Sequence, residues 1–261
     1  MTSAKAPIKK KKKKDTLLNI LAPLVVLAII VFGLQIICTV FKVNPHVIPK
    51  PFDMVTETIK MFPDIWPHFL FTLKIVLLGF IISVPLGMLI AAVLSQSKVL
   101  TNAMSPIILV LVITPMMTLV PLMLLWLGTN PNLRLLVIIV QATPIITFNT
   151  LNGFTHVEKE KLELGAAVGA NKLQTFSKIT FMNAMPQVFT GVKLGCIFSV
   201  IGAISADFVG GKVGMGTRIV FYTKYNNTAV VFGCIILVAI LGLALYYAVN
   251  ALERRIVLWK K

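Results

Sequence analysis

The side chains best suited to chemistry are scattered along this chain. Three cysteines stand singly inside apolar stretches and three histidines lie far apart: Cys38, Cys196, Cys234, His46, His68 and His156. None has the spacing of a disulfide framework or a zinc site, so we interpret the cysteines as buried small side chains and the histidines as loop residues. Gly210-Gly211-Lys212 lacks the upstream glycine and the following hydroxyl of a phosphate-binding loop. The sequence therefore predicts no catalytic residues, no cofactor and no metal.

The composition indicates which elements position these residues. Of 261 residues, 57% are hydrophobic and only 13% are charged, and the mean hydropathy is +0.90. A soluble domain carries about a quarter charged residues. Because this chain has roughly half that share, most of its surface must face lipid, where helices satisfy their own backbone groups. We expect an all-α integral membrane protein.

Apolar runs set the expected domain organisation. A transmembrane helix needs about 20 predominantly apolar residues. The first run is too long, and lacks the cleavage site, to be a removed signal peptide. After a basic tail at 1–15, we expect one transmembrane domain at 16–261. Its six expected spans lie at approximately 16–41, 70–97, 103–127, 133–155, 185–209 and 225–252.

The net charge of +16 sets the expected orientation. Seven of the 25 basic residues lie in the first 14 positions, without interleaved aromatic residues or a following recognition fold, so we do not expect nucleic-acid binding. Attraction to anionic lipid headgroups is a secondary expectation. The face that holds both termini collects sixteen basic residues and the opposite face seven. The positive-inside rule therefore predicts cytoplasmic termini.

The loop after the first run is polar and rich in proline. Within 43–68, four apolar residues fall at helical spacing: Phe52, Val55, Ile59 and Phe62. They predict a short amphipathic helix on the outer surface. Interfacial binding and simple packing both remain open for it.

The segment 156–184 is too polar for a span and too long for a tight turn. Glu158, Glu160 and Glu163 alternate with lysines in its first half, which favours a helix. Gly165 and Gly169 follow four positions apart among alanines, so a second backbone can approach closely and the chain can turn at Gly169. The pattern predicts a helix–turn–helix, which is either a docking surface or a structured loop.

This segment resembles the signature of the permeases of ABC importers, an acidic residue followed six positions later by glycine. Glu163 matches the acidic residue and Gly169 the glycine, whereas Leu164 and Gly165 replace two alanines. Met182 stands where proline is usual, and Pro186 matches a second proline. The resemblance implies that 156–184 is a coupling segment that enters a groove of an ATPase. The docking residues would be Glu163, Leu164, Gly165, Ala166, Gly169 and Ala170.

The resemblance extends over 48–216, most closely to the subfamily for nitrate, sulfonates and taurine. It rests on Ile48-Pro49-Lys50-Pro51, Thr72-Leu73, Gly79-Phe80, Pro85-Leu86-Gly87, Thr114-Pro115, Pro121-Leu122, Trp126-Leu127-Gly128, Gly191-Val192-Lys193-Leu194, Asp207-Phe208-Val209-Gly210 and Gly214-Met215-Gly216. It implies a six-helix importer permease of the bacterial inner membrane for a small anionic or vitamin-precursor-like solute. The implied partners are a P-loop ATPase dimer, a second identical or paralogous permease and an external solute-binding protein.

Four residues are candidates for the translocation path or its surroundings. Charged residues inside spans are costly and often functional. Asp207 is either on the path or an acid at the outer interface, and Lys193 is favoured as a snorkelling anchor. Pro115 and Pro121 either break the third span and expose backbone groups or only kink it.

Two other classes compete with the permease interpretation. An ion-coupled secondary transporter or channel subunit usually shows internal repeats and several ionisable residues near mid-membrane, and we find neither. A membrane-embedded enzyme needs convergent His, Asp or Glu residues, which are also lacking. We therefore expect a translocating subunit without its own ATPase site.

Overall fold

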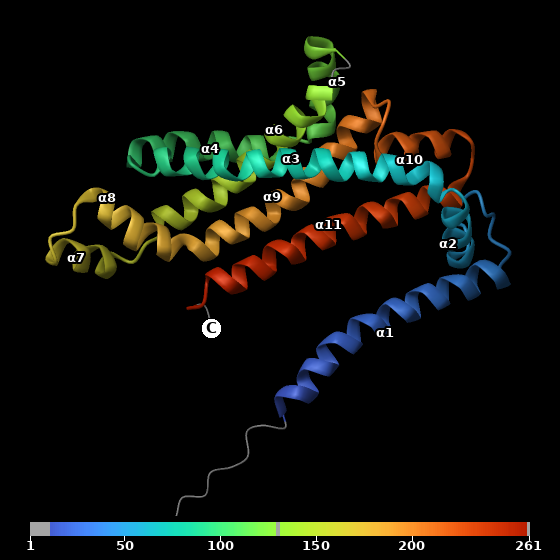
Figure 1. Cartoon of the computed structure of the whole chain (residues 1–261), viewed down its shortest axis with the longest axis horizontal. Helices are drawn as coiled ribbons and strands as arrows, with labels where there is room; N and C mark the ends of the chain where they lie inside the picture. The colour runs from blue at the N-terminus through green and yellow to red at the C-terminus, as the bar shows by residue number, and fades with distance from the viewer. Residues whose placement is uncertain (1–10, 129–130, 260–261) are drawn as a thin grey trace, which may run out of the picture. The chain divides into compact units, whose positions relative to one another are not determined.

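The computed structural model describes residues 11–128 and 131–259, with side chains at 21–128 and 132–259. Its regular elements are all helical, and no strand occurs in this described part (Figure 1). The predicted all-α class is confirmed. Of the basic tail expected at 1–15, residues 1–10 lie outside the described part of the chain. The helices are α1 (Lys11–Val40), α2 (Pro51–Lys60), α3 (Phe62–Leu94), α4 (Lys98–Ile113), α5 (Met116–Leu127), α6 (Pro131–Thr155), α7 (Lys159–Ala167), α8 (Lys172–Thr175), η1 (Phe176–Thr180), α9 (Phe181–Gly210), α10 (Met215–Lys224) and α11 (Thr228–Ile256).

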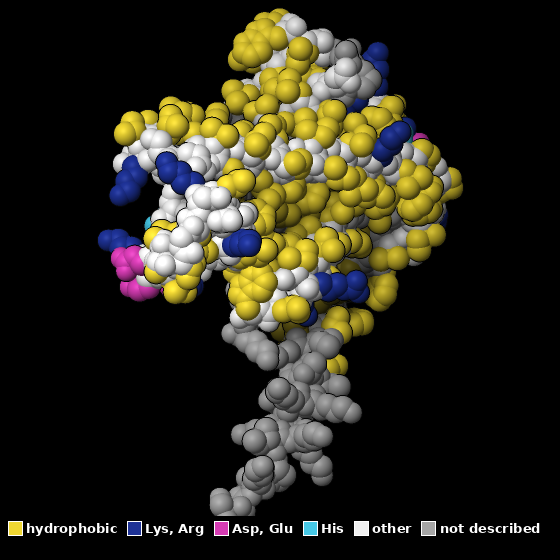
Figure 2. Space-filling model, turned by 60° about the vertical axis from the view of Figure 1, so that its left-hand side comes forward, with side chains coloured by type: hydrophobic (Ala, Val, Ile, Leu, Met, Phe, Trp, Pro, Cys, Tyr) yellow, Lys and Arg dark blue, Asp and Glu magenta, His cyan; other side chains and the backbone are white. Residues whose placement is uncertain are grey.

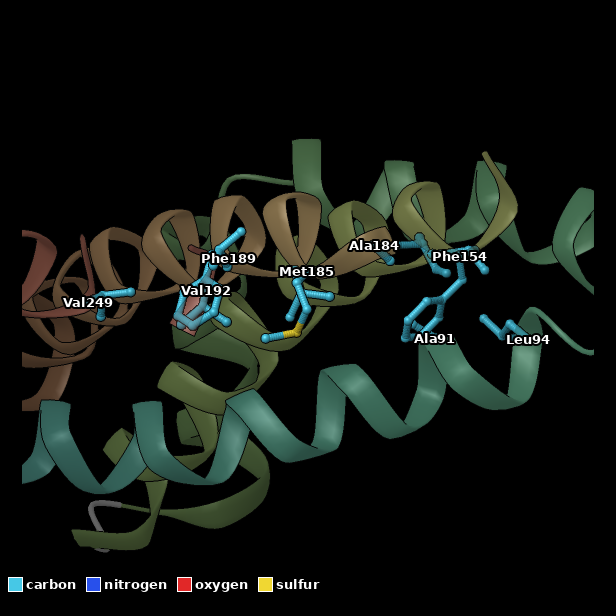
Figure 3. Close-up of a cluster of buried hydrophobic side chains, with 12 residues drawn as sticks. Ala91, Leu94, Phe154, Ala184, Met185, Phe189, Val192 and Val249 are labelled. Atoms are coloured by element: carbon cyan, nitrogen blue, oxygen red, sulfur yellow. The ribbon is translucent and has the colours of Figure 1, made fainter. Parts of the chain in front are cut away.

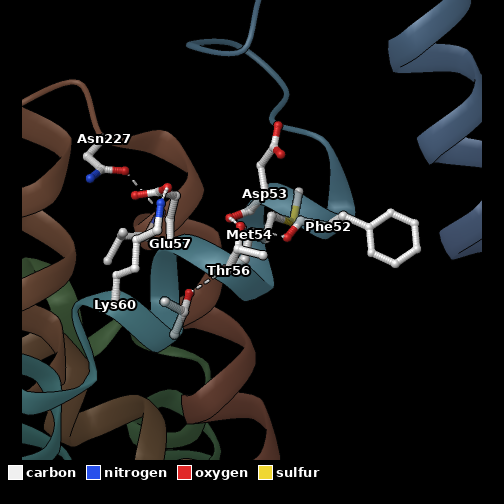
Figure 4. A network of polar contacts seen from close by, with 9 residues as sticks. Phe52, Asp53, Met54, Thr56, Glu57, Lys60 and Asn227 are labelled. Atoms are coloured by element: carbon white, nitrogen blue, oxygen red, sulfur yellow. Dashed lines mark hydrogen bonds and ion pairs between the residues drawn. The ribbon is translucent and has the colours of Figure 1, made fainter.

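The described residues form two compact units: 11–61 with 222–233, and 62–128 and 131–221 with 234–259. In the first unit, Thr58 of α2 packs directly against Gly233. The polar side of α2 carries an ion pair of 2.6 Å between Lys60 and Glu57 (Figure 4). Its apolar side is exposed at Phe52, Val55 and Ile59. The amphipathic helix expected within 43–68 is therefore α2.

Within the described residues, five stretches of helix are long and apolar enough to cross a membrane. They are Leu21–Val40, Phe62–Leu94, Asn132–Thr155, Lys172–Gly210 and Thr228–Ile256. A sixth stretch consists of α4 and α5 together, which are bent by 91°. Apolar side chains cover most of the visible face of the molecule, interrupted by small charged groups (Figure 2). Such a surface suits lipid and not water.

The bend between α4 and α5 occurs at Thr114-Pro115. Thr114 is extended, with φ −60° and ψ 120°, because the ring of a following proline disfavours helical backbone. Pro115 has no N–H to continue the ladder and becomes the N-cap of α5. Pro121, in contrast, lies within the continuous helix α5. Of the two prolines considered as helix breakers, Pro115 is at the break.

The second unit is built around α6, which packs between α3 and α9. Ile138 and Ile146 of α6 face glycines on both neighbours: Gly79 and Gly87 on α3, and Gly195 and Gly202 on α9. A methyl group at Gly87 would lie 2.8 Å from Cγ2 of Ile146. The three backbones approach this closely because glycine has no side chain.

The longest stretch of helix runs from Lys172 to Gly210 and contains α8, η1 and α9. One face of α9 contributes Ala184, Met185 and Phe189 to a buried cluster with Phe154 of α6 (Figure 3). This packing holds the beginning of α9, and the short elements before it, against the helix bundle.

Candidate functional site

The segment 156–184 folds as two short helices joined by a tight turn. The turn is a Schellman motif: the N–H of Ala170 donates to the carbonyl of Gly165, and the N–H of Gly169 donates to that of Ala166, both at 3.0 Å. Gly169 has φ 73°, a left-handed conformation that favours glycine. The backbone of Gly169 therefore makes the turn predicted from the sequence.

The second helix begins with its own cap. The side chain of Asn171 accepts a hydrogen bond of 2.8 Å from the N–H of Gln174, whose side chain accepts one of 2.9 Å from the N–H of Asn171. This capping box satisfies N–H groups that the helix itself leaves unpaired. The helix then passes through the π-helical turn η1 into α9.

Gly165 joins the two halves of the segment. It is buried, and a methyl group there would lie 2.6 Å from Cδ1 of Ile179. The side chain of Ile179 therefore packs onto the bare backbone of α7. Among the six expected docking residues, Gly165 thus faces the protein interior.

The remaining expected docking residues lie on the outside of the turn. Glu163, Leu164, Ala166 and Gly169 are exposed and Ala170 is half-buried. Leu164, Val168 and Leu173 are 66%, 75% and 76% exposed. Val168 was missed in the sequence, although its place directly before the turn glycine was a usable signal. We name the group formed by Glu163, Leu164, Ala166, Val168, Gly169, Ala170 and Leu173 the knuckle.

The far end of α9 carries a buried ion pair. Oδ1 of Asp207 accepts a hydrogen bond of 2.7 Å from Nε of Arg134, and the Asp207 side chain is 2% exposed. The N–H of Gly216 donates to the other carboxylate oxygen at 3.3 Å, and Nη2 of Arg134 donates to the carbonyl of Val213 at 3.0 Å. Asp207 thereby anchors the loop between α9 and α10. Its partner Arg134 was not predicted.

A second set of contacts holds this loop to α3. The N–H of Gly214 donates to Nδ1 of His68 at 3.0 Å, and the N–H of Met215 to the hydroxyl of Thr72 at 2.9 Å. Nη2 of Arg218 lies 2.7 Å from Nε2 of the same histidine. The interpretation of His68 as a loop residue is therefore wrong: it lies in α3 and is buried, and its Nδ1 accepts a hydrogen bond from the loop between α9 and α10.

Lys193 pairs with an acid on α11. Its ammonium lies 2.7 Å from the carboxylate of Glu253 and 6.0 Å from the ring centre of Tyr246. An ammonium beside a carboxylate and an aromatic face is stabilised without reaching water. Lys193 is thus part of an interhelical contact, and its expected role as a snorkelling anchor stays a prediction.

The expected path residues come from two helices. Pro115 is the N-cap of α5, Pro121 lies within α5 and Asp207 lies in α9. Leu124 of α5 packs against Gly210 at the end of α9. The Asp207 carboxylate is paired with Arg134 and its side chain is only 2% exposed, so it does not face an open path in this structure. Within the described residues, no group of three His, Cys, Asp or Glu side chains is placed to bind a metal.

A bundle of apolar helices that carries the folded segment 156–184 between two of its long helices has the form of a multi-pass membrane subunit. Residues 83–258 match the family described as binding-protein-dependent transport system inner membrane component. The chain belongs to this family of ABC importer permeases. The predicted permease class and its multi-pass inner-membrane location are confirmed.

Similar proteins cover nearly the whole chain. The formylaminopyrimidine transport permease protein ThiX of Halalkalibacterium halodurans is 26% identical over 84% of this chain and 88% of its own length. The putative aliphatic sulfonates transport permease protein SsuC of Bacillus subtilis is 26% identical over 99% and 94%. The nitrate import permease protein NrtB of Synechocystis is 26% identical over 98% of both chains.

Solved structures support the fold. A chain of the inward-facing MetNI methionine ABC transporter aligns with 75% of this chain and 95% of its own length, with a TM-score of 0.59 and 20% identity. An amino acid ABC transporter aligns with 77% and 97%, with a TM-score of 0.61 and 17% identity. The predicted importer-permease bundle is thus confirmed as the fold.

Proposed function

We propose that this chain carries a small solute across the inner membrane while a separate P-loop ATPase binds to the knuckle. The observation that supports the docking site is the exposure of Leu164, Val168 and Leu173 around a turn fixed by capping hydrogen bonds. Leu164 of α7 and Val168 directly after it lie outside the candidate spans of the described chain, and Leu173 stands at the polar beginning of the stretch Lys172–Gly210, so we expect all three apolar side chains to face water when no partner covers them. A partner protein removes them from water, which is the main favourable term in most protein association.

The proposed assembly contains two permease chains, identical or paralogous, and an external solute-binding protein. Each permease chain forms a single transmembrane domain. The excess of basic residues beside both termini supports a cytoplasmic location for the termini and for the knuckle. Each knuckle then faces one subunit of an ATPase dimer. ATP binding shifts the two permeases between inward-open and outward-open states because the ATPase binds these states with different affinity.

The names of the relatives support the solute class. They include permeases for aliphatic sulfonates, taurine, nitrate and formylaminopyrimidine. We therefore propose a small anionic or vitamin-precursor-like solute. Its route would pass beside α5 and the end of α9, near Pro115, Pro121 and Asp207, where a bent helix and a charge pair meet within the bundle.

Purification of the tagged chain from its host in mild detergent, followed by mass spectrometry, tests the central proposal. A P-loop ATPase should co-purify in stoichiometric amount and be lost from the variants Val168→Glu and Gly169→Lys. Lys159→Glu is the matched control, because it reverses the charge of an exposed residue outside the knuckle, and this variant should retain the ATPase. Transport that runs on an ion gradient without any ATPase would instead identify a secondary transporter.

A further inference from the structure

A hollow of about 350 Å³ lies beside α7, on the side of Leu164. It is formed by three parts of the chain: α7, the turn η1 with the first residues of α9, and the residues after α11. Its apolar lining is Leu164, Ile179, Met182 and Trp259. Leu164, Met182 and Trp259 are exposed on its surface. The hollow therefore adjoins the knuckle at Leu164 and is also lined by Trp259, which follows α11.

The polar lining of the hollow is positive. Lys161 and Lys178 stand at its rim, together with Asn183, and no carboxylate lines it. Lys161 is held in place by Glu158 at 3.1 Å and by Asn183 at 2.7 Å. Lys178 makes no ion pair within the described residues. An apolar recess with an unneutralised ammonium fits an apolar side chain that has a carboxylate next to it.

From this geometry we infer that the hollow is a second contact for the ATPase subunit. It receives an apolar side chain of that subunit, and Lys178 pairs with an adjacent carboxylate. The inference rests on the proposed function, because the hollow shares Leu164 with the knuckle. It adds Trp259, which follows α11, to the docking surface. Trp259 supplies the large, rigid aromatic area that often dominates the energy of interfaces.

The contact has a mechanical consequence for the helices behind it. The ATPase subunit would hold the beginning of α9 through Met182 and the residues that follow α11 through Trp259. Deeper in the bundle the same two helices are joined by the ion pair between Lys193 and Glu253. A displacement at the hollow is thus passed to α9 and α11 together.

Binding of the co-purifying ATPase subunit to the full-length permease in detergent, measured by biolayer interferometry, tests the inference. We expect Trp259→Ala and Lys178→Glu each to weaken binding about tenfold, as loss of an interface aromatic or a paired charge does. Leu258→Ala and Lys159→Glu are matched controls, because these residues are exposed but do not line the hollow. The controls should change affinity less than about twofold. Equal unfolding midpoints of all four variants would show that folding is unchanged.

Three results would overturn the inference, and they are distinguishable. If Gly169→Lys abolishes binding while Trp259→Ala and Lys178→Glu bind normally, the ATPase docks on the knuckle alone and the proposed function stands. If the unaltered chain binds no ATPase, the proposed function fails with the inference. If the variants weaken binding only in nanodiscs that contain anionic lipid, and not in detergent or neutral nanodiscs, the hollow holds a lipid headgroup.

Discussion

The guanidinium of Arg134 lies 2.7 Å from the carboxylate of Asp207, although 73 positions separate the two residues. One comes from the start of α6 and the other from the end of α9, the two most extensively packed helices in the structure. Arg134 also binds the carbonyl of Val213, and Asp207 binds the amide of Gly216. The pair therefore holds the loop between α9 and α10 as well as the two helices.

Replacing Asp207 with alanine should destabilise the protein strongly. Arg134, whose side chain is 12% exposed, would lose the carboxylate that pairs with it, and breaking such a largely buried pair costs about 3 kcal/mol. The thermal unfolding midpoint of the purified variant in detergent would fall accordingly. The double variant Arg134→Leu with Asp207→Leu removes both charges and should lose much less. Equal losses in the single and double variants would contradict a specific pairing.

Replacing Gly165 with alanine should disturb the knuckle, because the new methyl group would lie 2.6 Å from Cδ1 of Ile179. Overpacking of this kind costs about 1–3 kcal/mol. Limited proteolysis of 156–184 should therefore become faster. Adding Ile179→Val removes the Cδ1 atom and should restore resistance.

Gly169→Ala is the matched control for this rescue. A methyl group at Gly169 meets no atom within 4 Å, but the φ of 73° is strained for alanine by about 1–2 kcal/mol. Its effect on proteolysis should thus persist when Ile179→Val is added. Rescue of both glycine variants by Ile179→Val would refute the contact between Gly165 and Ile179.

Replacing Lys193 with methionine should loosen α11. Glu253 would keep its buried charge without the ammonium at 2.7 Å, at a cost of about 3 kcal/mol. The unfolding midpoint should fall, and the exchanged pair Lys193→Glu with Glu253→Lys should recover part of the loss. No difference between Lys193→Met and the exchanged pair would show that the two charges are not coupled.

Two glycines test the close packing around α6. A methyl group at Gly195 would lie 2.5 Å from Cγ1 of Ile146, so Gly195→Ala should destabilise the protein by about 1–3 kcal/mol. At Gly242 the nearest atom is 4.0 Å away, and alanine there should stabilise α11 by about 0.5–1 kcal/mol. Opposite changes in the unfolding midpoints are therefore expected. A similar response of both variants would argue against the packing of α6 on α9.

Hydropathy predicted the helical class well because it reports which surface faces lipid. It does not report where a helix ends in water. The apolar run at 185–209 belongs to a helical stretch that already begins at Lys172, since the residues before it continue as α8, the π-helical turn η1 and the start of α9. The sequence did not decide whether Pro115 breaks the third span or only kinks it, because proline does either according to its packing.

The turn at Gly169 followed from local chemistry, since a left-handed residue between two helical stretches favours glycine. The ion-pair partners of Asp207 and Lys193 could not be predicted from local chemistry, because they lie 73 and 60 positions away and no sequence period connects them. The same is true of Trp259, which meets the segment 156–184 only after α11 has crossed the bundle. Local patterns predicted the turn, whereas tertiary packing determined these contacts.

The continuous helical stretch from Lys172 to Gly210, which includes the π-helical turn η1, has the geometry of a lever with two arms. Its 39 residues span about 58 Å at the rise of 1.5 Å per residue. A tilt of about 10° around its midpoint would move each tip by about 5 Å, in opposite directions, over that length. The knuckle lies beside one tip and Asp207 near the other, so such a tilt would move these two sites in opposite directions.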